Sequence, residues 1–346
     1  LKDRESLGSD ALSARDAAGL LLDAEWRWSD TPTAANAPET SVEALEALRS
    51  STRWRMRIEL VSVGRMRLTF MGQGYPWAEG TELRARVDRL GHVLVWPDEK
   101  HYRHVVVGAL RALFTDRRLD RGPLFTPKVM AGPTAALLGQ STLKRNVNTP
   151  VGEVQLESAT LAAAGSGAIL LCRFLVELVG ADPDLAECSA DQVVLRANIA
   201  SAPGGKLQFI VNHFSKKLEL PLAGIQVPPD NAHFETSGLP LPQSGTVSRQ
   251  QLLALRSHAV AASAATRDAP AQGLVAANRT LALRALLVDG AVVAWLMPGA
   301  ELSIPELKSG TYMIAWRDFF GTLSEPAKTV ALPARVNLGD AAEPGG

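Results

Sequence analysis

The sequence predicts a mainly β (α+β) fold: antiparallel sheets with two or three packed helices, followed by a small C-terminal β-sandwich. Apolar and charged residues alternate with a period of two from residue 53 onward. Tight-turn dipeptides such as Asp289-Gly290 separate short apolar runs, and a few segments show the helical period instead. The 346 residues exceed the size at which one hydrophobic core usually stops growing, so we expect more than one domain.

Five regions are expected along the chain. Residues 1–50 form a polar, acidic segment with short helices. Residues 51–258 form the α+β main domain, with a division into two subdomains near residue 130 left open. Small residues dominate 259–272, which is typical of a linker. Residues 273–336 form the sandwich module, and 337–346 form a flexible tail.

The first strands follow from the period-two pattern. A short helix is expected around residues 12–21, and a strand at 24–28. In residues 53–60 the apolar positions from Trp54 to Leu60 point inward, and the intervening positions are charged. Further antiparallel strands are expected at 65–70, 83–87, 91–96, 143–147, 152–156, 193–199 and 207–214.

Helices are expected where the apolar spacing changes to three and four. Residues 105–114 carry one apolar face, and residues 167–179 form the most apolar helix of the chain. A third, short helix is expected at 248–258. These segments supply the two or three helices that we expect to pack on the sheets.

The C-terminal region is the most clearly patterned. It combines a strand, the turn at Val288-Asp289-Gly290, a proline-containing connection, a Leu-x-x-Gly-x-Tyr segment from Leu307 to Tyr312, and a final strand at 328–332. This arrangement resembles the PEGA-type β modules of bacterial envelope proteins, although the four-residue signature that names the family is absent. The resemblance implies an accessory module of a surface or envelope protein and carries over no catalytic residue. Residues 1–270 resemble no family that we recognise.

Charge and composition narrow the function classes. Hydrophobic residues make up 46% and charged residues 21%, which excludes a disordered chain. The formal net charge is zero, so the overall basic excess of nucleic-acid-binding proteins is missing. Residues 51–129 nevertheless hold 15 basic and 8 acidic side chains, a local excess of +7. No run of 18 apolar residues is present, so no membrane-spanning helix is predicted.

The two cysteines bear on the compartment. Cys172 and Cys188 lie 16 residues apart with a turn between them, and we expect a disulfide; two buried free thiols are the alternative. A disulfide implies an oxidising compartment, either periplasmic or extracellular, whereas free thiols suit the cytoplasm. A leader or lipid anchor before Leu1 is left open.

For the histidines and the serine that could take part in catalysis, we favour a structural role over a catalytic one. His101 and His104, with Glu99 as ligand or base, would form a metal site if they lay at helical spacing. The favoured interpretation is two polar residues at the start of a helix. Ser166 lacks the Gly-x-Ser-x-Gly turn of a hydrolase nucleophile and is expected to cap the following helix. No metal or cofactor site is predicted.

An arginine-rich sheet face is the main candidate for binding. Arginines alternate with apolar residues on three expected strands, so their side chains share one face, which suits phosphate, sulfate or carboxylate groups. A solvated face with internal partners is the alternative. The candidate residues are Arg53, Arg55, Arg57, Arg65, Arg67, Arg84 and Arg86.

The loop at residues 72–77 adds two aromatic residues to this candidate site. It lacks the third glycine of a dinucleotide-binding loop. Its Tyr75 and Trp77 either stack on a sugar or other flat ligand, or fold back onto the core, and we favour the second.

The sequence therefore leaves three functions open. The first is a non-enzymatic cell-envelope or periplasmic binding or scaffold protein whose partner is a protein or an envelope polymer. The second is a binder of an anionic polymer, such as an acidic glycan, a lipid headgroup or nucleic acid, through the arginine face; nucleic acid is disfavoured because the chain has no net basic charge. The third is a metal-dependent enzyme that uses His101 and His104.

Overall fold

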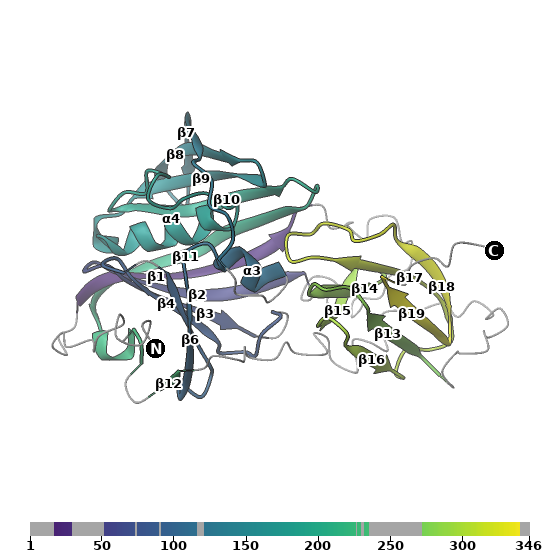
Figure 1. Ribbon diagram of the computed structural model, residues 1–346. Coiled ribbons are helices and arrows are strands. Elements are labelled where there is room, and N and C mark those ends of the chain that lie inside the picture. Colours follow the sequence, from purple (N-terminus) through teal and green to yellow (C-terminus); the bar gives the residue numbers. More distant parts are fainter. Residues whose placement is uncertain are drawn as a thin grey trace.

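The computed structural model describes residues 17–29, 52–72, 75–89, 91–115, 121–225, 227–229, 232–234 and 272–339. Within these residues strands account for 55% and helices for 9%. The strands form one sheet of twelve, one of three and one of four (Figure 1). The prediction of an α+β fold with two or three packed helices is therefore wrong, although a mainly β fold is correct. Only two α-helices, α3 (Leu110–Thr115) and α4 (Gly167–Glu177), occur in the described part.

One expected helix is a strand instead, and another forms only in its second half. The segment expected as a helix at 105–114 begins at the end of strand β6 (His101–Val105) and turns at Gly108, whose φ of 93° no helix can accommodate, so it is helical only from Leu110 onward, in α3. The expected helix at 12–21 enters β1 (Ala17–Trp28), in which Leu20 and Leu22 are buried with a period of two. The expected elements at 248–258 and 259–271 lie outside the described residues, as does the end of the expected tail.

The twelve-stranded sheet is antiparallel except where the short β12 pairs with β6. From edge to edge its order is β12-β6-β5-β4-β3-β2-β1-β11-β10-β9-β8-β7, so β1 lies next to β11, a strand far away in the sequence. Besides β1 and β6, its strands are β2 (Arg53–Val61), β3 (Arg65–Met71), β4 (Glu82–Arg86), β5 (His92–Val95), β7 (Lys128–Leu137), β8 (Gln140–Thr149), β9 (Gly152–Thr160), β10 (Gln192–Ser201), β11 (Lys206–Leu220) and β12 (His233–Phe234).

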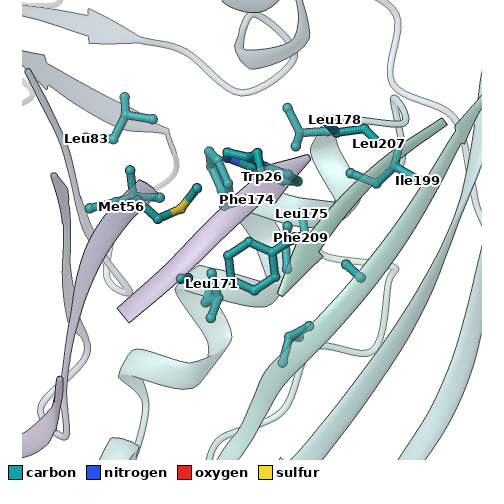
Figure 2. Packing of buried hydrophobic residues seen from close by; sticks show 14 of the residues in the cluster. Trp26, Met56, Leu83, Leu171, Phe174, Leu175, Leu178, Ile199, Leu207 and Phe209 are labelled. Carbon is teal, nitrogen blue, oxygen red and sulfur yellow. The ribbon is translucent and has the colours of Figure 1, made fainter. Parts of the chain in front are cut away.

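Helix α4 covers one face of this sheet. It contacts β10, β2, β3 and β4, and its Leu171, Phe174 and Leu175 are fully buried (Figure 2). The ring of Trp26 lies 6.2 Å from Phe174 and 5.2 Å from Phe209, centroid to centroid. The part of this face that α4 covers is therefore filled by packed side chains.

The C-terminal strands form two further sheets, drawn in green to yellow in Figure 1. The three-stranded sheet has the order β16-β13-β19, and the four-stranded sheet has the order β15-β14-β17-β18. Buried side chains from both sheets, among them Leu286, Tyr312 and Trp316, make a cluster of their own. The strands are β13 (Leu274–Asn278), β14 (Arg284–Val288), β15 (Ala291–Leu296), β16 (Glu301–Ile304), β17 (Gly310–Arg317), β18 (Lys328–Leu332) and β19 (Ala334–Leu338).

Phe319 joins the C-terminal strands to the large sheet. Its ring centroid lies 6.2 Å from that of Trp26, 5.8 Å from Trp54 and 4.5 Å from Phe114. The indole Nε1 of Trp28 donates a hydrogen bond of 3.0 Å to the Phe319 carbonyl oxygen. The largest hydrophobic cluster therefore runs without a break from the twelve-stranded sheet into the C-terminal strands.

A disulfide connects Cys172 in α4 to Cys188, ahead of β10, as the sequence predicted. It closes a loop of 16 residues. Cys172 is buried in the main core, and Cys188 packs against that core. The bond therefore ties the helix to the chain that leads into β10.

We expect the disulfide to contribute measurably to stability. Replacing both Cys172 and Cys188 by alanine should lower the free energy of unfolding by about 3 kcal/mol, because the open loop gains conformational entropy in the unfolded chain. Urea unfolding without reductant measures this loss. In the presence of reductant the native protein and the double variant should come closer together, and equal stability without reductant would contradict the expectation.

Candidate functional site on the open face of the large sheet

Around β1 and β2 the face of the twelve-stranded sheet opposite α4 carries polar side chains, whereas over β5 it is covered by an apolar cluster that includes Val93, Val95 and Val227. On β2 the exposed Arg53, Arg55 and Arg57 alternate with the buried Trp54 and Met56. We call the face that carries these arginines the open face. The predicted orientation of this strand, with apolar residues inward and arginines outward, is confirmed for these residues.

Arg53 and Arg55 lack partners within the described residues, where neither forms a hydrogen bond or ion pair. Arg57 lies 3.8 Å from Asp23 on β1, at the limit of an ion pair, and about half of each side chain is exposed. Such an exposed pair contributes little to stability. Arg53 and Arg55 are therefore available to an external anion.

Two of the other predicted arginines already have carboxylate partners inside the protein. Arg67 donates hydrogen bonds of 2.6 and 2.9 Å to the two carboxylate oxygens of Glu59. Burial alone would lower the pKa of Arg67, but the hydrogen bond and charge of Glu59 raise it above its ordinary value. Arg84 lies 2.6 Å from Glu82 and 3.1 Å from Glu99, and its side chain is only 3% exposed. The prediction that Arg67 and Arg84 are ligand-binding cations is not supported by these positions.

The remaining two predicted arginines are also much less exposed than Arg53 and Arg55. Arg86 forms an ion pair with Asp88 at 2.6 Å, and that contact holds the pKa of the Asp88 carboxyl below its usual value. Arg65 is 3% exposed. Alternation along β3 and β4 predicted which side these side chains take, but it contained no information about the carboxylates that neutralise them.

Tyr75 and Trp77 are buried and cannot stack on a ligand. Each is 1% exposed, and their rings lie 4.4 Å and 4.7 Å from that of Phe70. The Tyr75 hydroxyl donates a hydrogen bond to the Trp54 carbonyl oxygen at 3.0 Å. The prediction that Tyr75 and Trp77 bind a ligand is therefore wrong. Both rings bury their large apolar area in the core, which is the alternative that the sequence favoured.

A row of amide side chains crosses the open face beside the arginines, and sequence reasoning missed it. Arg27 Nε donates to Gln208 Oε1 at 2.7 Å, and Gln208 Nε2 donates to Asn198 Oδ1 at 2.7 Å. Asn198 Nδ2 then donates to Gln155 Oε1 at 3.4 Å, and Gln155 Nε2 donates to Asn146 Oδ1 at 3.3 Å. We call these five residues the amide row.

The amide row is continuous because its members occupy matching register positions. Gln208 is opposite both Arg27 and Asn198, and Gln155 is opposite both Asn198 and Asn146. Arg53 is opposite Arg27 on the other side, so the row runs directly into the exposed arginines. Adjacent strands are about 4.8 Å apart, so these six positions span about 24 Å across the sheet.

The histidine pair is not arranged as a metal site. His101 and His104 lie in strand β6 rather than in a helix, and strand alternation places residues three apart on opposite faces. His101 Nδ1 lies 3.0 Å from Asp98. In the described part of the chain no three histidine, cysteine or acidic residues are grouped closely enough to hold a metal ion.

A buried polar pair lies on the other side of the sheet. Both ring nitrogens of His92 are buried and have no hydrogen-bond partner among the described residues, and Glu177 accepts hydrogen bonds from the backbone N–H groups of Gly108 and Leu110 at 2.7 and 3.3 Å. Burial lowers the pKa of His92 to about 4 and raises that of Glu177 to about 7. The cavity that they line has a volume of about 10 Å³, which holds no more than one water molecule, so it is not a substrate site.

No family model matches this sequence, and a search of curated proteins finds no match. Among solved structures, the chain is similar to PNGF-II, with a TM-score of 0.34, 9% identity, and coverage of 63% of this chain but only 30% of that one. It is similar to MucB in complex with MucA(peri), with a TM-score of 0.30, 6% identity, and coverage of 87% and 71%. A LolA superfamily protein from Nitrosomonas europaea gives a TM-score of 0.28 and 8% identity, with coverage of 60% and 89%. Among the described residues, no helix is long and apolar enough to cross a membrane.

Proposed function

We propose that this chain is a non-enzymatic binding protein of the bacterial cell envelope that holds an acidic polymer on the open face of its large sheet. The observation that carries the proposal is the exposure of Arg53 and Arg55 without partners in the described residues, beside Arg57 and Arg27. Arg53 lies opposite Arg27 on β1, and an anionic ligand relieves the repulsion between these two guanidinium groups.

Guanidinium groups suit this role because they present several N–H donors in a fixed plane and stay charged at any physiological pH. Arg53 and Arg55 alternate with core residues on β2, so the rigid sheet holds both on one side. A polymer with repeated carboxylate, phosphate or sulfate groups can offer each of these cations a separate anionic group.

The disulfide supports the proposal that the protein resides in the cell envelope. Such bonds persist in oxidising environments and are rare in the cytosol. Cys172–Cys188 is formed in the structure, and the resemblance of residues 273–336 to PEGA-type modules implies the same location. A periplasmic or surface site also gives the open face access to envelope polymers.

Reversing the charges of Arg53 and Arg55 should strongly weaken polymer binding. In the Arg53→Glu plus Arg55→Glu variant, affinity for polyglutamate should fall about tenfold or more, because each reversal replaces an attraction by a repulsion. Fluorescence anisotropy with labelled polyglutamate, at about 20 and about 200 mM salt, measures this, and binding to the native protein should weaken at the higher salt.

The matched control makes the same charge change far from the open face. Lys328→Glu plus Arg335→Glu replaces two cations of the C-terminal strands whose exposed ion pairs contribute little to stability. It should leave binding unchanged. If both double variants weaken binding equally, or if the native protein binds no polyanion at low salt, the proposed function is wrong.

A further inference from the structure

The hydrogen bonds of the amide row all run in one direction. Each member from Arg27 to Gln155 donates to the next, and Asn146 is the last acceptor. Bonds arranged in this way polarise one another, which holds the side chains in one orientation. The row is therefore a fixed line of polar groups rather than a set of independent surface amides.

Each amide in the row has hydrogen-bonding capacity left over. An amide carries two N–H donors and an oxygen with two lone pairs, and each bond along the row uses only one donor and one lone pair. The side chains of Asn146, Gln155, Asn198 and Gln208 are partly exposed. Donors and acceptors therefore repeat about every 4.8 Å across the sheet.

Hydroxyl groups are the natural partners of such a line, because each hydroxyl both donates and accepts. Carboxylates, phosphates and sulfates only accept, so they suit the guanidinium end at Arg53 and Arg55 better than the amides. A ligand that fits both parts is extended, rich in hydroxyl groups, and acidic.

We propose that the amide row and the adjoining arginines form a binding site for an acidic polysaccharide that lies across the strands. The inference rests on the proposed function, since it names the ligand class of the same face. Sugar hydroxyls bond to the amides of the row, and uronate carboxylates or similar anionic groups pair with Arg53 and Arg55.

The surroundings favour a glycan over single-stranded nucleic acid. Proteins that bind single strands stack bases on exposed aromatic rings. Tyr75 and Trp77 are buried, and Trp26, Trp28 and Trp54 point into the core, so none of these five rings can stack on a ligand at the open face, where His213 is the exposed ring beside Asp23.

The test compares two polyanions that carry the same acidic group. Polygalacturonate has both carboxylates and hydroxyls, whereas polyglutamate of matched charge has carboxylates and no hydroxyls. We expect the native protein to bind polygalacturonate at least about tenfold more tightly than polyglutamate, a difference that several amide–hydroxyl bonds readily supply. Fluorescence anisotropy with labelled polymers at one salt concentration measures both affinities.

The variant Gln155→Ala plus Asn198→Ala removes the two central amides. It should lose the preference for polygalacturonate and keep the native affinity for polyglutamate, which also shows that the variant is folded. The control Gln140→Ala plus Gln272→Ala removes two amides outside the row and should keep the preference.

The outcomes separate this inference from the proposed function. Equal binding of the two polymers by the native protein, or an unchanged preference in the Gln155 and Asn198 variant, overturns the polysaccharide site while the anion-binding function stands. Failure of the native protein to bind either polymer removes the proposed function itself.

Discussion

Replacing Phe319 by alanine should lower the free energy of unfolding by about 3–5 kcal/mol, the usual loss for a fully buried phenylalanine. Phe319 is 0% exposed, and its ring lies within 6.3 Å of those of Trp26, Trp54, Phe114 and Trp295, counted between centroids. The cavity left behind would sit where the large sheet meets the C-terminal strands. Urea unfolding, followed by tryptophan fluorescence and by circular dichroism, measures the effect.

The matched control is Met313→Ala on β17. Met313 belongs to the same group of strands and is 42% exposed, so its truncation should change stability by less than about 0.5 kcal/mol. In the Phe319 variant the two optical signals should still change together, because one continuous core joins the parts. A loss below about 1 kcal/mol would show that Phe319 does not hold the junction.

The second large effect is the pH dependence of stability that two buried groups, Glu177 and His92, produce. Burial raises the pKa of Glu177 from 4.5 to about 7, so between these values the folded protein keeps a proton that the unfolded chain releases, and stability falls as pH rises. Burial lowers the pKa of His92 from 6.5 to about 4, with smaller contributions from the charges of His104 and Arg173. Between pH 4 and 6.5 only the unfolded chain takes up that proton, so this contribution to stability rises with pH. The two contributions therefore nearly cancel.

Single variants should reveal each contribution. The stability of Glu177→Gln relative to the native protein should rise by roughly 3 kcal/mol between pH 4.5 and 7, since one pKa unit corresponds to about 1.4 kcal/mol. The relative stability of His92→Leu should fall by a similar amount between pH 4 and 6.5. Urea unfolding at a series of pH values gives both curves. Glutamine can still accept the hydrogen bonds from Gly108 and Leu110, so the fold should be retained.

Glu219→Gln, which changes an exposed carboxyl group on β11, is the control for the pH series. Its stability relative to the native protein should vary little over the same range. Relative stabilities of the Glu177 and His92 variants that do not change with pH would show that neither group is titrated in the way that its burial implies.

Local pattern was enough to predict some of the site. Alternation along residues 53–60 placed Arg53, Arg55 and Arg57 on the side opposite Trp54 and Met56, because side chains in a strand alternate strictly. On β3 and β4 the same rule did not predict which arginines are free to bind a ligand. There the pattern is similar, yet Glu59 and Glu82 neutralise the arginines, and such pairing depends on which strands are neighbours.

The amide row shows the same limit more sharply. Strands β8 and β9, and strands β10 and β11, are joined by short turns. The turn positions in the sequence therefore suffice to predict that Asn146 pairs with Gln155 and Asn198 with Gln208. The two pairs become one continuous row only because β9 also pairs with β10 and β11 also pairs with β1. Arg27 and Gln208 are 181 residues apart, and no local pattern indicates that they meet. The expected helix at 105–114 was correct only from Leu110 onward, because apolar spacing did not reveal the turn at Gly108.

Strands β1 and β2 contain tryptophans whose fluorescence can report on ligand binding at the open face. Trp26, Trp28 and Trp54 are sequence neighbours of Arg27, Arg53 and Arg55, and they point to the opposite side of the same two strands. The indole Nε1 atoms of Trp26 and Trp54 are buried and have no hydrogen-bond partner in the part of the chain that the structure describes, so their emission responds to the local electric field rather than to solvent. A polyanion seated on the arginines alters that field through a single layer of backbone. Ligand binding should therefore shift the intrinsic fluorescence of the unlabelled protein.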